Sequence, residues 1–121
     1  MILKLVVTTN VNGDVFELIL RDSKYGIGRR HDNDLRIKET YVSGYHSEIN
    51  RTADGDYQLK DLGSSNGTFL NGRRIEAPES IKAGDFIKFG ILKVAVKEHG
   101  EDSGPKIVSL KDRPVFAKKR D

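Results

Sequence analysis

Short runs of branched and aromatic residues, separated by Asn, Asp and Gly, are the feature that most restricts the fold of this chain. Such runs are typical of β-strands bounded by turns, and none of them continues into an apolar stripe of helical period. We therefore expect strands at residues 2–8, 15–20, 25–28, 35–37, 47–52, 57–62, 68–70, 73–75, 85–90 and 91–97. Many short strands at close spacing predict an all-β sandwich or barrel.

The turn residues between these runs indicate hairpins. Asn71 and Gly72 give the sharpest signal, because both tolerate the positive φ that a two-residue hairpin turn demands. Similar signals occur at residues 10–14 (NVNGD), 53–56 (ADGD) and 83–85 (AGD). We expect each of these segments to reverse the chain between neighbouring strands.

Length and charge narrow the possible classes of protein. A chain of 121 residues is long enough for one domain with one core. The absence of Cys excludes a disulfide framework and thiolate chemistry. The 21 basic and 18 acidic residues are interspersed, which disfavours a nucleic-acid-binding stripe. No apolar run approaches the roughly 18 residues that span a bilayer, so we expect a cytoplasmic protein that binds no membrane.

The composition changes near the C-terminus. Residues 98–121 contain two of the three prolines and no periodic apolar face. We therefore expect one domain over residues 1–97 and a tail or linker over residues 98–121, whose short basic run (KKR) is typical of a solvated surface.

Three polar connections carry the chemistry of this sequence. They lie within residues 25–37, 41–49 and 60–75, and each contains glycine between strand-like runs. Loops of a sandwich gather at its ends, so these three connections are expected to form one surface. That surface would present Arg29, Ser43, His46, Ser65 and Asn66.

The motifs in these connections resemble those of the forkhead-associated (FHA) domain family. They are Gly28-Arg29, Ser43-x-x-His46, Asn66-Gly67-Thr68 and Asn71-Gly72, in that order and between strand-like runs. The resemblance covers roughly residues 2 to 97. It implies a β-sandwich of two mainly antiparallel sheets with about eleven short strands, SMAD/FHA-like, whose end loops bind a phosphothreonine in an extended peptide.

The resemblance also implies roles for individual residues. Arg29 would hold the phosphate, Ser43 would donate its hydroxyl to a phosphate oxygen, and Asn66 would hydrogen-bond the peptide backbone. Ser65 would lie near the phosphothreonine, while His46 would brace the loops without touching the ligand. The expected contact set is therefore Arg29, Ser43, Gly44, Ser65 and Asn66, supported by Gly28, His46, Gly67, Thr68, Asn71 and Gly72.

Elementary chemistry agrees with these roles. A phosphate carries about −1.5 to −2 charges near neutral pH, and a planar guanidinium can meet two of its oxygens with parallel hydrogen bonds. Short Ser and Asn side chains add donors without filling the space that a peptide needs. The glycines allow the chain to turn closely, and hairpin geometry is the preferred explanation of Gly67 and Gly72.

Gly44 departs from the family pattern, in which Arg, Lys or Asn often follows the motif serine. One account is a missing contact, which Arg30 would replace, although alternation along a strand predicts that Arg30 points away. The other account is that Gly44 adopts a positive φ. Candidates for selecting the sequence around the phosphothreonine are Tyr41, Tyr45 and Arg73.

Other interpretations of the same residues remain open from the sequence. Arg29 alone fits an ion pair with Asp32 or Asp34, and Ser43, His46 and Asp61 complete a catalytic triad on paper. No strained nucleophile elbow accompanies them, and the segment GSSNG lacks the Gly-Lys-Ser/Thr ending of a nucleotide-binding loop. The three His residues, His31, His46 and His99, have no metal-like spacing with carboxylates.

The sequence therefore predicts a phosphothreonine-dependent peptide-binding module that acts in signalling or recruitment, with no catalytic residue, metal or cofactor. Its partner would be a threonine-phosphorylated protein or peptide, and not a nucleic acid. The alternative is a structural or assembly domain that keeps this fold and binds its partner without phosphate. A steep salt dependence of binding would instead identify a nucleic-acid binder.

Overall fold

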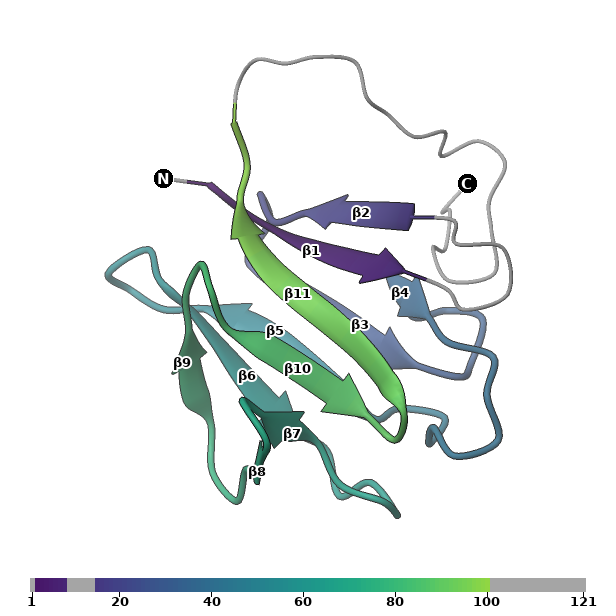
Figure 1. Ribbon diagram of the computed structural model, residues 1–121. Coiled ribbons are helices and arrows are strands. Elements are labelled where there is room, and N and C mark those ends of the chain that lie inside the picture. The colour runs from purple at the N-terminus through teal and green to yellow at the C-terminus, as the bar shows by residue number, and fades with distance from the viewer. Residues whose placement is uncertain (1, 9–14, 101–121) are drawn as a thin grey trace.

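The computed structural model describes residues 2–8 and 15–100, which form eleven β-strands and no helix (Figure 1). The strands are β1 (Leu3–Thr8), β2 (Val15–Ile19), β3 (Lys24–Gly28), β4 (Leu35–Arg36), β5 (Ser47–Arg51), β6 (Tyr57–Asp61), β7 (Phe69–Leu70), β8 (Arg73–Arg74), β9 (Glu79–Ile81), β10 (Phe86–Phe89) and β11 (Leu92–Glu98). The all-β prediction is confirmed.

The strands form two sheets that pack into a sandwich (Figure 1). The six-stranded sheet has the order β2-β1-β11-β10-β7-β8, and the five-stranded sheet has the order β4-β3-β5-β6-β9. Among the described strands only β3 and β4 pair in parallel, with Ile27 opposite Leu35. The expectation of two mainly antiparallel sheets is therefore confirmed.

Alternating side chains build the core between the sheets. Along β1, and from Leu92 to Val96 of β11, every second residue is buried, as the period of a strand requires. The largest fully buried apolar side chains include Leu5, Ile27, Ile49, Ile87 and Phe89. Each side chain of this size contributes about 1.5–3 kcal/mol by leaving water, so the core holds the ends of the strands in fixed positions.

One strand was missed by the sequence analysis. The strand β9 is only three residues long, follows Pro78, and buries one apolar side chain, Ile81. Its pairing with β6, in which Tyr57 lies opposite Ile81, places it at the edge of the five-stranded sheet. A strand this short has no alternating pattern that the sequence could reveal.

The expected hairpin at residues 83–85 is wrong. Gly84 has a φ of 102°, so the segment is a turn, but it joins β9 in one sheet to β10 in the other. The segment at residues 53–56 does close a hairpin between β5 and β6, with Gly55 at φ 91°. The turn expected at residues 10–14 lies outside the described residues.

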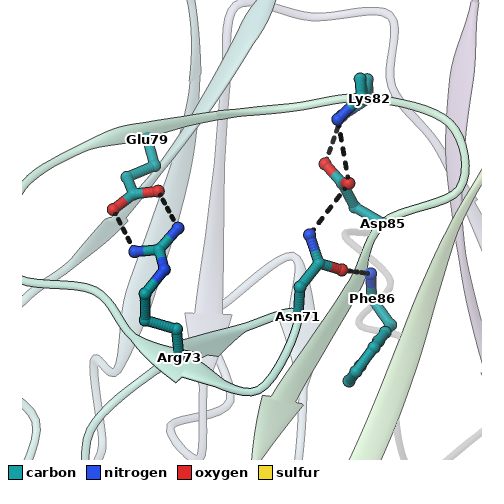
Figure 2. Close-up of polar contacts among 6 residues, drawn as sticks. All are labelled: Asn71, Arg73, Glu79, Lys82, Asp85 and Phe86. Carbon is teal, nitrogen blue, oxygen red and sulfur yellow. Dashed lines mark hydrogen bonds and ion pairs between the residues drawn. The ribbon is translucent and has the colours of Figure 1, made fainter.

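The turn at Asn71 and Gly72 is confirmed, with φ values of 54° and 88° and Leu70 paired with Arg73. Figure 2 shows that the Asn71 side chain also ties this turn to β10. Its Nδ2 donates to Asp85 Oδ1 at 3.1 Å, and its Oδ1 accepts from the amide of Phe86 at 2.9 Å. Asn71 therefore both forms the turn between β7 and β8 and links that turn to the start of β10.

The expected boundary after residue 97 falls within β11, which ends at Glu98. The amide of His99 still donates to the carbonyl of Ile2 at 2.7 Å. Most of the expected tail, residues 101–121, lies outside the described residues, so the division into domain and tail stays a prediction. Within residues 2–8 and 15–100, no helix is long and apolar enough to cross a membrane.

Candidate functional site

Three connections meet at one end of the sandwich, at the lower right of Figure 1. They join β3 to β4, β4 to β5, and β6 to β7. Hydrogen bonds run directly between them, so the three loops form one continuous surface. We call them the binding loops, after the role expected from the sequence, and define them by their residues as 29–34, 37–46 and 62–68.

Arg29 begins the first binding loop directly after β3, and its side chain is exposed. Its backbone amide donates to the carbonyl of Ser43 at 2.9 Å, and its Nε donates to the carbonyl of Val42 at 2.9 Å. One N–H of the guanidinium is thus fixed by the second loop. The orientation of this charged group is set by the fold, although the group itself lies at the surface.

Ser43 joins the second loop to the third. Its Oγ accepts a hydrogen bond from the amide of Ser65 at 3.1 Å. A serine hydroxyl has one hydrogen to donate besides its lone pairs, so this contact leaves the donor of Ser43 unused. Ser65 itself is exposed beside it.

Asn66 makes a second contact between the same two loops. Its Nδ2 donates to the carbonyl of Tyr41 at 2.9 Å, while its side chain is exposed. The next residue, Gly67, is buried and has a φ of 90°, which favours glycine. The site therefore holds the side-chain amide of Asn66 in a fixed orientation, in the residue that follows Ser65.

His46 is fully buried beneath these loops. Its Nδ1 accepts from the amide of Ser43 at 3.1 Å, and its Nε2 lies 2.9 Å from the carbonyl oxygen of Gly67. Because an amide can only donate and a carbonyl can only accept, Nε2 carries the ring hydrogen of a neutral imidazole. The ring also packs edge-on against Phe89, with centroids 5.2 Å apart. One side chain thus braces the second and third loops against the core.

Asp61 organises the third loop, a role that the sequence analysis did not assign. Its Oδ1 accepts from the hydroxyls of Ser64 and Thr68, both at 2.6 Å, and its Oδ2 accepts from the amides of Gly63 and Ser64. Thr68 is fully buried and also contacts the Ser47 hydroxyl at 2.6 Å. The short spacing from Asp61 to Ser64, typical of an Asx-type turn, is the signal that could have revealed this role.

These contacts change the acidity of Asp61. Burial alone would raise its pKa, but the hydrogen bonds from Ser64, Thr68 and Gly63 outweigh burial and hold the pKa below its ordinary value of 3.8. The carboxylate is therefore charged near neutral pH, and the hydroxyls and amides of its own loop surround that charge.

Gly28 and Asn33 shape the approach of the first and second loops. A Cβ at Gly28 would overlap the carbonyl of Gly44, so no larger residue fits there without moving backbone. Asn33 is 3% exposed, and its Nδ2 donates to the carbonyls of Arg30 and Gly44. Asn33 is another supporting residue that the sequence analysis missed, since a single Asn in a loop carries no distinctive pattern.

Both expectations about the surroundings of Gly44 need correction. The φ of Gly44 is not in the left-handed region, so strain does not explain the glycine. Arg30 does not point away, because β3 ends at Gly28 and strand alternation no longer applies. Instead, Cγ and Cδ of Arg30 lie 3.0 and 3.1 Å from where a Cβ of Gly44 would be. Arg30 fills the space that a side chain at position 44 would occupy.

Arg30 is held in this position by two neighbours. Its Nε donates to the Tyr45 hydroxyl at 3.0 Å, and its guanidinium carbon lies 5.3 Å from the centre of the Tyr45 ring. The Tyr45 hydroxyl in turn donates to Asp32 at 2.8 Å, and this hydrogen bond is the main cause that lowers the pKa of Asp32. The three side chains form an exposed polar cluster at the rim of the loops.

The three proposed selectivity residues lie in different surroundings. Tyr45 is 48% exposed, and Tyr41 is half-buried with its ring against Gly90. Arg73 forms a paired hydrogen bond with Glu79 at 2.8 and 2.9 Å, outside the binding loops. Only the two tyrosines therefore belong to the surface of the loops.

The structure does not arrange Ser43, His46 and Asp61 as a catalytic triad. The ring of His46 binds the amide of Ser43, not its hydroxyl, and its other nitrogen is occupied by Gly67. Asp61 binds hydroxyls and amides of its own loop. Within residues 2–8 and 15–100 there is also no group of three or more His, Cys, Asp or Glu side chains that could hold a metal ion.

Known proteins are similar to this chain in sequence and in fold. The human protein named angiogenic factor with G patch and FHA domains 1 is 41% identical over 87 residues, which cover 64% of this chain and 12% of that protein. A structure from a study of phosphothreonine-dependent FHA domain interactions is 29% identical, with a TM-score of 0.70, and covers 83% of this chain and 99% of its own.

A third relative is EmbR of Mycobacterium tuberculosis, solved in complex with a low-affinity phosphopeptide. It is 26% identical, with a TM-score of 0.69, and the match covers 84% of this chain and 26% of EmbR. The chain thus spans only a small part of its larger relatives. The sequence model of the FHA domain matches residues 25–90, which is more than half of the chain. The chain belongs to the FHA domain family.

Proposed function

We propose that this chain is a phosphothreonine-dependent peptide-binding module that recruits a phosphorylated partner in signalling. The observation that carries the proposal is the meeting of a fixed guanidinium, a hydroxyl and an amide on adjoining loops. These groups belong to Arg29, Ser43 and Asn66. They offer hydrogen bonds to an anion and to a peptide backbone, and their geometry supplies no proton relay.

The phosphate is bound by Arg29 and Ser43. The Nε of Arg29 is engaged by Val42, so the Nη groups meet the phosphate oxygens. Ser43 accepts from the amide of Ser65 and therefore turns its own hydrogen toward a phosphate oxygen. Both groups are oriented before the ligand arrives, which reduces the entropy lost on binding.

The peptide is bound by Asn66 and Ser65. The Nδ2 of Asn66 remains on the carbonyl of Tyr41, and its Oδ1 accepts from a backbone amide of the ligand. Ser65 lies next to the phosphothreonine side chain. Because the backbone and the phosphate are held at once, an extended ligand binds more tightly than free phosphate.

Arg30 contributes the positive charge that Gly44 lacks. Its stem covers Gly44 and its guanidinium is stacked on Tyr45, at the rim of the same loops. We assign it to the phosphopeptide contact set beside Arg29. The charge of Asp32, which binds the Tyr45 hydroxyl, moderates this contribution.

The relatives support the proposal. The solved FHA domains include one from a study of phosphothreonine-dependent interactions and one bound to a phosphopeptide. Both are similar to this chain over more than four-fifths of its length. From these relatives we carry over only the function of the FHA domain, and not that of the longer proteins that contain it.

An oriented library of phosphothreonine peptides, screened against the same library without phosphate, tests the proposal. We expect selected phosphopeptides to bind with micromolar affinity, about −8 kcal/mol. Arg29→Ala should weaken binding by about 30-fold or more, because one partner of a desolvated charge pair is lost. Equal binding of both libraries would contradict the proposal and favour a phosphate-independent assembly domain.

A further inference from the structure

A hollow of about 370 Å³ lies beside the third binding loop and is not part of the phosphate site described above. Its walls come from the end of β6, from β8, and from the segment that leads to β9. Two cationic side chains, Lys60 and Arg74, line it together with the carboxylates of Asp61 and Glu76. Lys60 and Arg74 attract an anion and the two carboxylates repel one, so the fit of an anion depends on how far each carboxylate is compensated by its own partners.

Arg73 and Arg74 are neighbours on β8 but differ in their contacts. Figure 2 shows Arg73 reaching the carboxylate of Glu79, with which it forms two hydrogen bonds. Within the described part of the chain, the side chain of Arg74 makes no hydrogen bond and no ion pair. Arg74 therefore offers a complete set of guanidinium donors, whereas Arg73 already gives two of its donors to Glu79.

Arg74 also lies directly against the third binding loop. Its Nε and Cζ are 2.7 and 3.0 Å from where a Cβ of Gly67 would be, so the glycine leaves room for the guanidinium. Gly67 follows Asn66, whose amide we assign to the backbone of the ligand. A peptide held at Asn66 is therefore adjacent to the hollow.

The two carboxylates of the hollow have different effects. Both oxygens of Asp61 already accept hydrogen bonds from the hydroxyls and amides of the third loop, so its charge is compensated there. Glu76 is exposed and has no such donors within residues 2–8 and 15–100. It is the group that competes with an incoming anion for Arg74 and Lys60.

We propose that Arg74, assisted by Lys60, forms a second anion-binding subsite for a carboxylate or second phosphate on the same threonine-phosphorylated ligand. The inference rests on the proposed function, because the phosphothreonine must first hold the ligand on the binding loops. The subsite makes this domain selective for phosphothreonine within an acidic or multiply phosphorylated segment. Arg73, which is paired, takes no part.

The test uses synthetic phosphothreonine peptides with an alanine background, in which a single Glu is moved one position at a time. We expect one narrow range of positions to raise affinity by about three- to tenfold, as a partly exposed charge-assisted contact does. A parallel series with phosphoserine at the same positions identifies the source of the anion. A gain with Glu assigns the subsite to carboxylates, and a gain with phosphoserine alone assigns it to a second phosphate.

Matched variants identify the residue responsible. Arg74→Gln should remove the gain and leave the affinity for the Glu-free peptide unchanged, while Arg73→Gln should keep the gain. Arg74→Lys should restore part of it, and Glu76→Gln should increase it. These comparisons remain informative if Arg74→Gln also loosens the third loop, because a loosened loop would weaken binding of the Glu-free peptide as much as binding of the Glu-containing one.

Two negative results are distinguishable. If the wild type binds the phosphothreonine peptides equally well wherever Glu or phosphoserine is placed, the second subsite is refuted and the proposed function stands. If the wild type binds none of the phosphothreonine peptides, the proposed function fails and this inference fails with it. A gain that persists in Arg74→Gln would also overturn the assignment to Arg74.

Discussion

Replacing Asp61 by Asn tests whether its carboxylate stabilises the third binding loop. The wild-type side chain accepts four hydrogen bonds, two from hydroxyls and two from amides. Asn has one acceptor oxygen, and the amides of Gly63 and Ser64 cannot accept from its NH2 group. The oxygen must therefore face these amides, and the hydroxyls of Ser64 and Thr68 must turn to accept.

This rearrangement replaces charge-assisted hydrogen bonds with weaker neutral ones. Each of the four exchanges costs about 0.5–1 kcal/mol, so Asp61→Asn should lower the free energy of unfolding by about 2–4 kcal/mol. Asp61→Ala, which leaves the loop donors without this acceptor, should lower it by more. Urea unfolding at neutral pH measures both variants, with the exposed Asp54→Asn as control.

The pH dependence gives an independent check of the same reasoning. The pKa of folded Asp61 lies below 3.8, its ordinary value, so its stabilising effect is present above that pH. The effect is lost as the pH falls through the lower folded pKa. The difference between wild type and Asp61→Asn should therefore be largest near neutral pH and shrink below about pH 4. A difference under about 0.5 kcal/mol at neutral pH, or one that grows in acid, would show that the Asp61 carboxylate does not stabilise the third binding loop.

Three further outcomes are expected. His46→Ala should lower the free energy of unfolding by about 3–5 kcal/mol, because a buried ring is lost together with its bonds to Ser43 and Gly67; unchanged thermal melting would contradict a bracing role. Gly28→Ala should lower the free energy of unfolding, measured in urea, by about 1–3 kcal/mol, since the new methyl group overlaps the carbonyl of Gly44. A variant as stable as the wild type would show that the first and second loops move apart at little cost. Lowering the pH through about 6 should weaken phosphopeptide binding as the phosphate gains its second proton, and constant affinity in calorimetry would argue against a dianion.

Much of the fold followed from local patterns. The alternating runs in β1 and β11 and the Asn71-Gly72 turn were predictable because strand period and left-handed φ have direct residue signatures. The three-residue strand β9 had no period to detect, and the turn at Gly84 did not reveal that it crosses between sheets. Which sheet a strand joins depends on pairing between distant segments.

The candidate site was predictable in its parts and less so in its connections. Arg29 and Ser43 were identified from motifs, and the structure brings them to adjoining loops. The position of Arg30 was missed because it depends on the empty space at Gly44, which only the folded backbone reveals. The buried bonds of Asn33 were missed for a similar reason, since nothing in the sequence distinguishes this Asn from a solvated one.

Phosphothreonine binding by these loops is tested most directly by an NMR titration of the chain with one phosphothreonine peptide and with its dephosphorylated counterpart. We expect saturable shifts for the Arg29 Nε–H, the Ser43 and Ser65 amides and the Asn66 side-chain amide with the phosphopeptide alone. The amide of Asp54, in the hairpin between β5 and β6, should not shift. Equal shifts with the dephosphorylated peptide, or phosphate-dependent shifts confined to other parts of the sandwich, would contradict the claim that these loops bind phosphothreonine.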